Sequence, residues 1–136
     1  MNYNPTKNEI DFIAQALTKF NDEKVGPDNH KLLNIVEYDE NKNIIAGILG
    51  GTYWGWMHID ILWVDKDFRK KGIGTQLLKA AEDEARKRGC HFVHVDTMSW
   101  QAPDFYKKNG YKIISELNDI PNGNKKYHLI KELNNL

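Results

Sequence analysis

The sequence lacks features that would cross-link the chain covalently or direct it to a membrane or to nucleic acid. One cysteine, Cys90, stands among its 136 residues, so no disulfide can form within the chain. Its 19 Lys and Arg balance its 19 Asp and Glu, and a net charge of zero creates no strong field to attract nucleic acid. No apolar run approaches the roughly 20 residues that a membrane span needs. We therefore expect neither a nucleic-acid partner nor a membrane partner.

The first residues and the lone thiol bear on the compartment. Residues 1–5 do not contain the apolar core of a signal peptide. A single unpaired thiol suits a reducing environment. We expect a cytoplasmic protein, and the length and the lack of repeats predict one domain over residues 1–136.

The most informative stretch runs from residue 58 to residue 75. The apolar run from His58 to Val64 predicts a buried strand, and helical spacing begins at Ile73. Between them lies a basic, glycine-containing loop, Arg69-Lys70-Lys71-Gly72-Ile73-Gly74-Thr75. Glycines let the backbone approach an anion closely. The free N–H groups and the positive dipole end of the following helix favour negative charge, so the arrangement predicts a phosphate site.

Two well-known phosphate loops do not fit this stretch. A P-loop requires a lysine directly after its last glycine, and here Gly74 is followed by Thr75. The dinucleotide fingerprint requires a third glycine three residues on, and that position is Leu77. The pattern that remains is Arg-x-x-Gly-x-Gly.

That pattern resembles the acyl-CoA pyrophosphate loop of the GNAT superfamily of N-acetyltransferases. Residues 102–111, Ala-Pro-Asp-Phe-Tyr-Lys-Lys-Asn-Gly-Tyr, are similar to the family's Ala-x-x-Phe-Tyr-x-x-x-Gly-Phe segment. The two segments occur in order, separated by a predicted helix and strand. The alternative is an ordinary strand–turn–helix with a solvated basic turn. The resemblance implies a small, bacterial-type, single-domain enzyme that uses acetyl-CoA.

Periodicity predicts the order of the elements. Helices are expected over residues 8–21, 73–88 and 102–109, and strands over residues 32–38, 44–51, 58–64, 91–97, 111–117 and 126–133. The strand–helix–strand unit implies one parallel pair in a largely antiparallel sheet. The predicted fold class is α+β, or mixed α/β, flanked by helices, which is the GNAT-like acyl-CoA N-acyltransferase fold that the resemblance implies. Few residues precede the first helix, so the family's first strand should be short or missing.

Three local features add to this pattern. Thr6 and Glu9 form a capping box at the start of the first helix. Gly50 and Gly51 weaken the end of their strand and predict a bend or a bulge. Residues 52–56 predict an aromatic connection whose rings fill the core or rim, or line a pocket.

The strand over residues 58–64 carries the candidate chemistry. Strict alternation places His58, Asp60, Leu62 and Val64 on one face, and the remaining residues, Ile59, Ile61 and Trp63, on the other. The resemblance implies that the backbone at Leu62 and Val64 pairs with the pantetheine arm, as an added strand would. It also implies that the N–H of Leu62 or Trp63 polarises the acetyl carbonyl.

Acetyl transfer to an amine needs a neutral nucleophile, and several residues are candidates for the base. By resemblance, His58 matches a position where some family members keep a carboxylate, and Asp60 lies one step nearer the thioester. Asp96, on the neighbouring strand, is a third candidate. Many family members have no dedicated base, so His58 can equally be structural and Asp60 a cap or an ion pair.

Tyr106 matches the family tyrosine whose hydroxyl faces the CoA sulfur as general acid; the alternative is a core tyrosine. Ser99 stands where the family commonly has an asparagine that bonds the cofactor. The resemblance implies no metal and these cofactor-binding residues: Leu62, Trp63, Val64, Arg69, Lys70, Lys71, Gly72, Ile73, Gly74, Thr75, Ser99 and Tyr106.

The acceptor side is the least defined part of the sequence. Residues 20–31, 53–56 and 118–127 are aromatic and polar without a strong charge bias, which favours a small-molecule amine attacked directly in a ternary complex. The alternatives are a protein or peptide amine, a catalytically silent acyl-CoA-binding module, and an interaction domain without a cofactor. A homodimer is possible.

Overall fold

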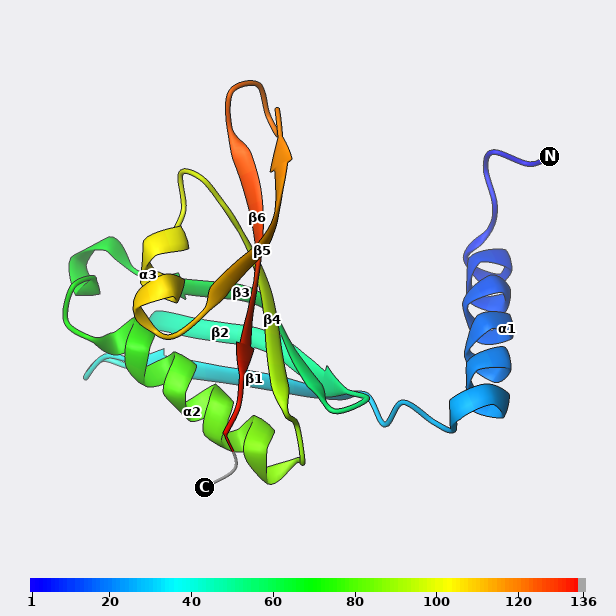
Figure 1. Cartoon of the computed structure of the whole chain (residues 1–136), viewed down its shortest axis with the longest axis horizontal. Helices are drawn as coiled ribbons and strands as arrows, with labels where there is room; N and C mark the ends of the chain where they lie inside the picture. Colours follow the sequence, from blue (N-terminus) through cyan, green and yellow to red (C-terminus); the bar gives the residue numbers. More distant parts are fainter. Residues whose placement is uncertain (135–136) are drawn as a thin grey trace.

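The computed structural model describes residues 1–134, and its strands form one sheet in the order β1-β2-β3-β4-β6-β5 (Figure 1). The strands are β1 (Lys31–Tyr38), β2 (Ile44–Tyr53), β3 (Trp56–Val64), β4 (Phe92–Met98), β5 (Lys112–Asn118) and β6 (Lys125–Glu132). The helices are α1 (Lys7–Val25), α2 (Ile73–Lys87) and α3 (Pro103–Lys108), with a 3-10 turn at Lys66–Phe68. Among the described strands, only β3 and β4 pair in parallel. The predicted fold class is confirmed, and within residues 1–134 no strand precedes α1.

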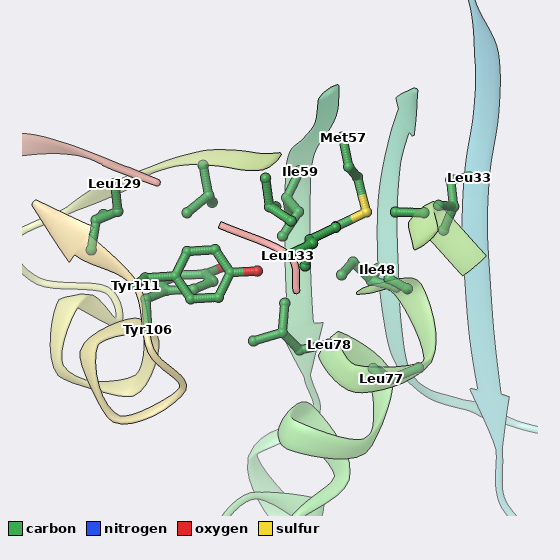
Figure 2. Packing of buried hydrophobic residues seen from close by; sticks show 14 of the residues in the cluster. Leu33, Ile48, Met57, Ile59, Leu77, Leu78, Tyr106, Tyr111, Leu129 and Leu133 are labelled. Carbon is green, nitrogen blue, oxygen red and sulfur yellow. The ribbon is translucent and has the colours of Figure 1, made fainter. Parts of the chain in front are cut away.

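The core lies between α2 and one face of the sheet. Helical spacing places Leu77, Leu78, Ala81 and Ala85 on the buried side of α2, where they meet β2 and β3. Each large side chain buried in this way stabilises the fold by about 1.5–3 kcal/mol. Figure 2 shows Leu78 beside Ile48 and Ile59, with the rings of Tyr106 and Tyr111 closing the core toward α3.

A buried carboxylate on α2 is paired from two sides. Glu82 accepts a hydrogen bond from the Tyr111 hydroxyl at 2.7 Å and an ion-paired hydrogen bond from Lys131 Nζ at 2.9 Å. Because a buried charge is costly unless it is paired and hydrogen-bonded, these two partners are what allow Glu82 to face the core. The network ties α2 to Tyr111, just before β5, and to Lys131 of β6.

The pleat of β3 changes phase at Asp60. Gly50 of β2 pairs with Ile59 of β3, and the preceding residue of β2, Leu49, pairs with Ile61. Asp60 is therefore an extra residue in β3, a β-bulge. Ile59 therefore shares the core side with Leu62 and Val64. His58, Ile61 and Trp63 lie on the opposite side, with Leu49 of β2. The predicted alternation is wrong beyond Asp60, because period-two spacing assumes that neither strand carries an insertion.

The bulge itself agrees with the prediction made from the glycine pair. A Cβ atom at Gly50 would collide with the carbonyl oxygen of His58 and lie 3.2 Å from the Cα of Ile59. Only glycine lets the two backbones come this close.

Two predicted boundaries are wrong. α1 continues for another turn, to Val25, so residues 22–25 are helical rather than part of a loop. The connection predicted over residues 52–56 is a tight turn at Trp54-Gly55, where both residues have positive φ. Thr52 and Tyr53 extend β2, and Trp56 opens β3 and stacks on Phe92 with ring centroids 4.7 Å apart. Thr52, Tyr53 and Trp56 are in strands rather than in a loop because aromatic and β-branched residues are stabilised by cross-strand pairing.

α1 stands apart from the rest of the chain (Figure 1). Its capping box is confirmed: Thr6 Oγ accepts from the Glu9 N–H, and Glu9 Oε1 accepts from the Thr6 N–H. The helix buries none of its residues. None of the described helices combines the length and the apolar character that crossing a bilayer requires.

Candidate active site

A cleft opens where β3 and β4 separate. The two parallel strands pair only from Trp56–Phe92 to Ile59–Val95, after which they diverge. The cleft has a volume of about 830 Å³ and is lined by the second half of β3, the loop before α2, the first turn of α2, the end of β4 and α3. The divergence leaves the second half of β3 without a partner on its β4 side, among the described residues.

The loop before α2 forms one end of the cleft. Gly72 is the N-cap of α2 in the left-handed region, at φ 82°, and no side chain caps the helix. No acidic residue occupies the first turn. The first-turn N–H groups of Ile73, Gly74 and Thr75 are therefore available to an anion, and the helix dipole favours one there. This arrangement fits the pyrophosphate of an acyl-CoA.

Arg69 and Gly74 shape the loop in ways that the sequence does not reveal. Arg69 Nε donates to the Val64 carbonyl at 2.9 Å, which ties the loop to the end of β3. A Cβ atom at Gly74 would lie 3.4 Å from the Phe105 ring. The small residue thus lets the start of α2 approach α3 closely. The sequence interpretation assigned Gly74 to contact with the anion, and the structure adds a role in packing.

Tyr106 is buried on α3, yet it lines the cleft. Within residues 1–134 its hydroxyl forms no hydrogen bond, and it is not fully enclosed. Burial, and then the charge of Asp96, raises the pKa of Tyr106 to about 12. The hydroxyl is therefore protonated at neutral pH, as a proton donor must be.

Two carboxylates occupy the point where the cleft closes. Asp60 follows Ile59 and Asp96 follows Val95, the last residues that pair β3 with β4, and both acids line the cleft. Asp96 lies 3.8 Å from Lys126 Nζ, a long ion pair. The cleft thus has an end at α2 where uncapped N–H groups favour an anion, and an acidic end at the strand junction.

Asp60 is also half of a pair. His58 Nδ1 lies 2.9 Å from Asp60 Oδ1, and His58 Nε2 lies 3.2 Å from Nε2 of His30. Since a carboxylate only accepts, His58 Nδ1 carries a proton, and in neutral His58 the Nε2 atom accepts from His30. His58 itself lies outside the cleft lining, so it meets the site through Asp60.

The sequence interpretation placed residues 20–31 on the acceptor side but did not single out His30. His30 precedes β1 and is distant from His58 along the chain, so no local spacing connects the two. Gly51 makes their contact possible, because a Cβ atom there would lie 2.8 Å from His58 Nε2 and 2.9 Å from His30 Nε2.

The profile of the Acetyltransferase (GNAT) family matches residues 3–111. The chain belongs to the GNAT family of acetyltransferases. Members of this family transfer an acetyl group from acetyl-CoA, so the chain is an acetyltransferase and acetyl-CoA is the donor. The structure places the family's loop and the family's tyrosine on the same cleft.

Three similar proteins extend over most of this GNAT chain. Blasticidin-S acetyltransferase of Streptomyces morookaense is 39% identical over 95 residues, covering 69% of this chain and 70% of its own. Acetyltransferase Atu2258 of Agrobacterium fabrum is 33% identical over 111 residues, covering 82% and 81%. The crystal structure of an acetyltransferase from Bacillus cereus ATCC 14579 superposes with a TM-score of 0.91 at 32% identity, covering 98% and 97%.

Most of the predicted cofactor-binding residues of this GNAT chain line the cleft, and two do not. Those on the lining are Leu62, Trp63, Val64, Arg69, Lys70, Gly72, Ile73, Gly74, Thr75 and Tyr106. Lys71 lies outside, with its ammonium 5.2 Å from the Phe68 ring centroid. Ser99 also lies outside: its hydroxyl donates to Asn124 and accepts from the Lys125 N–H. Trp100 and Gln101, the next residues, reach the lining instead.

Proposed function

We propose that this enzyme transfers the acetyl group of acetyl-CoA to the amine of a small molecule, by direct attack while both substrates are bound. The observation that carries the proposal is the pair of carboxylates, Asp60 and Asp96, at the closed end of the cleft. Their negative charge attracts an amine, which arrives as a cation, to a place beside the thioester. Tyr106 faces the same cleft from α3.

The Asp60–His58 pair takes the proton of the amine. Asp60 lines the cleft and His58 stands behind it at hydrogen-bond distance. A proton that leaves the amine nitrogen, directly or through water, can be held by this pair, with His30 as a further partner of the imidazole. The neutral nitrogen then forms a C–N bond with the acetyl carbon as the C–S bond breaks.

The chain supplies donors at the two remaining atoms. A backbone N–H of Leu62 or Trp63, on the unpaired half of β3, donates to the carbonyl oxygen as charge develops there. Tyr106 donates its phenolic proton to the leaving sulfur, and the second proton of the nitrogen, released as the amide forms, restores the phenol. This role is supported by the place of Tyr106 on the cleft lining and by the free position of its hydroxyl. A module that only binds acyl-CoA would not need a proton donor such as Tyr106 beside the sulfur.

The loop and β3 hold the donor substrate. The first-turn N–H groups of α2 and the side chains of Arg69 and Lys70 face the pyrophosphate, and the backbone of β3 from Leu62 to Val64 runs beside the pantetheine arm. A lone cysteine that has no second cysteine to pair with suits a reducing compartment, so the proposal places the enzyme in the cytoplasm, with residues 1–136 acting as one domain.

Blasticidin S is the first acceptor to test, because a relative that is 39% identical is named for it. Purified protein is incubated with acetyl-CoA and a panel that holds blasticidin S, other amine antibiotics, polyamines and lysine peptides. Free thiol and the mass of the product are measured. We expect turnover with a small amine. Turnover with peptides alone would indicate that the acceptor is a protein amine. No turnover with any amine would favour the silent acyl-CoA-binding module.

A further inference from the structure

The apolar face of α1 is uncovered. Ile10, Ile13, Leu17 and Phe20 follow one another at helical spacing, which places them on one side of the helix. Their exposed fractions lie between 53% for Ile10 and 67% for Ile13. A helix with such a face is stabilised mainly by packing it against something. The described part of the chain supplies no cover for it, since no residue of α1 is buried.

The sheet has an uncovered apolar surface of its own. α2 packs on one face of β1, β2 and β3, and the opposite face carries Leu32, Leu49, Ile61 and Trp63, which we call the β1–β3 patch. These four side chains are exposed to between 38% (Leu49) and 65% (Leu32). Neighbouring strands bring them together, so they form one surface rather than scattered contacts. A contiguous patch of this kind marks an interaction site.

The linker holds α1 away from this patch. The Asp28 carbonyl accepts from the Trp54 N–H at the tip of the β2–β3 hairpin, and the Asp28 carboxylate accepts from the His30 N–H. Pro27 lies between Asp28 and the last helical turn, and Gly26 has a φ of 81°. These hydrogen bonds hold residues 28–30 at the end of the sheet, and α1 lies beyond that end, as Figure 1 shows.

We propose that two copies of this chain exchange α1, so that the apolar face of each helix covers the β1–β3 patch of the other copy. The exchange obeys two-fold symmetry, because the same helix and the same patch meet twice. The 19 residues of α1 extend about 28 Å, close to the roughly 33 Å of the ten-residue strand β2. A short linker is the feature that favours such swapping over closure within one chain.

The surface available is sufficient for a stable dimer. Eight half-exposed large apolar side chains bury roughly 700 Å² in one contact, at about half the area of a fully buried aromatic side chain each. Two symmetric contacts double this to roughly 1,400 Å², within the approximately 1,200–2,000 Å² of stable interfaces.

A solved relative holds its helix in the same way. The Bacillus cereus acetyltransferase superposes over 98% of this chain with a TM-score of 0.91. Residues 1–25 are too large a share of the chain for that score to be reached with the helix elsewhere. The position beyond the sheet therefore recurs in a crystal structure, which argues for a second copy as the cover rather than for closure onto the helix's own sheet.

The exchange also bears on the site. Ile61 of the patch follows Asp60, and Gly51, which makes room for His58, pairs with Leu32 of the patch. The partner's α1 therefore forms a wall beside the Asp60–His58 pair on the acceptor side. The dimer itself can be tested without any assay of acetyl transfer.

Light scattering coupled to size exclusion measures the mass of the parent and of three variants. We expect a dimer for the parent, a monomer for Leu17→Glu/Phe20→Glu on α1 and a monomer for Leu49→Glu on the patch. Lys19→Glu, which changes charge on the opposite side of α1, should remain a dimer. Circular dichroism confirms that each variant is folded. A monomeric parent at micromolar concentration would overturn the proposal.

Mixing the two defective variants separates exchange from other dimers. The α1 variant retains its patch and the Leu49→Glu variant retains its α1, so the mixture keeps one of the two contacts. That single contact buries roughly 700 Å², below the range of stable interfaces, so we expect a weak heterodimer, detected by native mass spectrometry at high protein concentration. A dimer in which α1 pairs with α1 would leave the Leu49→Glu variant dimeric on its own, and that outcome would refute the exchange.

Discussion

His58 Nδ1 lies 2.9 Å from Oδ1 of Asp60, which joins two residues that the sequence offers only as alternatives. The β-bulge at Asp60 contributes to this, because it changes the phase of β3 while His58 stays beside its partner Gly51. A base made of two residues acts as a unit, and the effects of changing its members should not add.

Asp60→Asn should lower turnover by roughly a hundredfold or more with CoA affinity unchanged, because the amide cannot take the amine proton. His58→Gln should cost a similar factor, and the double variant should be no worse than roughly the poorer single one. Steady-state kinetics over a range of pH and a CoA titration measure these effects.

Asp96→Asn serves as the comparison, since Asp96 lines the same cleft and is paired with Lys126. We expect it to lose less activity than Asp60→Asn. If Asp60→Asn and the parent share one flat pH–rate profile, Asp60 is structural and the base role passes to His58 or Asp96.

Gly51→Ala should reduce turnover through the imidazole pair. The added Cβ would lie within 2.9 Å of both Nε2 atoms, so His30 and His58 must separate. CoA binding should persist, because Gly51 lies outside the cleft lining. Gly47→Ala in the same strand is the control, as its Cβ would meet only the Ile35 carbonyl, at 3.3 Å, and the side chain of Val36. Equal turnover in the two variants would mean that His30 is dispensable.

Tyr106→Phe should lower turnover by roughly tenfold to a thousandfold, the range that a general acid supplies. Its thermal midpoint should scarcely change, because the lost hydroxyl has no hydrogen-bond partner within residues 1–134. The loss should appear in kcat more than in binding, since the proton is needed as the sulfur leaves.

Tyr111→Phe is the matched control on the adjoining ring, 5.5 Å away between centroids. Its hydroxyl donates to buried Glu82, so the variant should lose about 1–3 kcal/mol of stability and keep its turnover at a temperature where it is folded. Parent-like turnover in Tyr106→Phe would show that the thiolate leaves unaided or takes its proton from water.

Gly72→Val should weaken CoA binding severely. Gly72 has a φ of 82° at the start of α2, where a β-branched residue is strained by about 1–3 kcal/mol, so the variant distorts the N–H groups that face the pyrophosphate. Gly89→Val tests the same strain at the other end of α2, at φ 81° with equally open surroundings. Calorimetric titration with CoA compares them, and equal affinities in two folded variants would refute the loop assignment.

Stability should fall above about pH 10 because the unfolded chain then loses tyrosine protons that the folded chain retains. Burial, and then the charge of Glu82, raises the pKa of Tyr111, and burial raises that of Tyr106 to about 12. Their contribution is complete below about pH 10 and declines as pH rises. Urea unfolding across this range should give a shallower decline for Tyr111→Phe, and parallel curves would contradict the assignment.

Local pattern was sufficient where one element and its neighbours in sequence decide the structure. The spacing of Leu77, Leu78, Ala81 and Ala85 predicted α2 because a helix buries one side against a sheet. Thr6 and Glu9 predicted the start of α1, since a capping box involves residues within one turn. The end of α1 was missed, because Asp22, Glu23 and Lys24 do not continue the apolar spacing that ends at Phe20.

Residues in contact across the fold show where local pattern fails. Alternation in β3 could not predict that Ile61 leaves the core side, because the insertion at Asp60 exists only relative to β2. Ser99 was assigned to the cofactor from its place before α3, but β6 begins beside it and Lys125 engages its hydroxyl.

The sequence by itself predicted the basic, glycine-containing loop before α2, since a strand end, basic residues, glycines and a helix start are consecutive from residue 58 to residue 75. It also singled out Tyr106, which lies in a continuous segment and lines the same cleft as the loop. Only the tertiary structure decided the contact of His30 with His58 and the uncovered faces of α1 and the β1–β3 patch. These depend on residues far apart in the chain, whose distance no local spacing encodes, and on a linker that keeps two apolar surfaces of one chain from meeting.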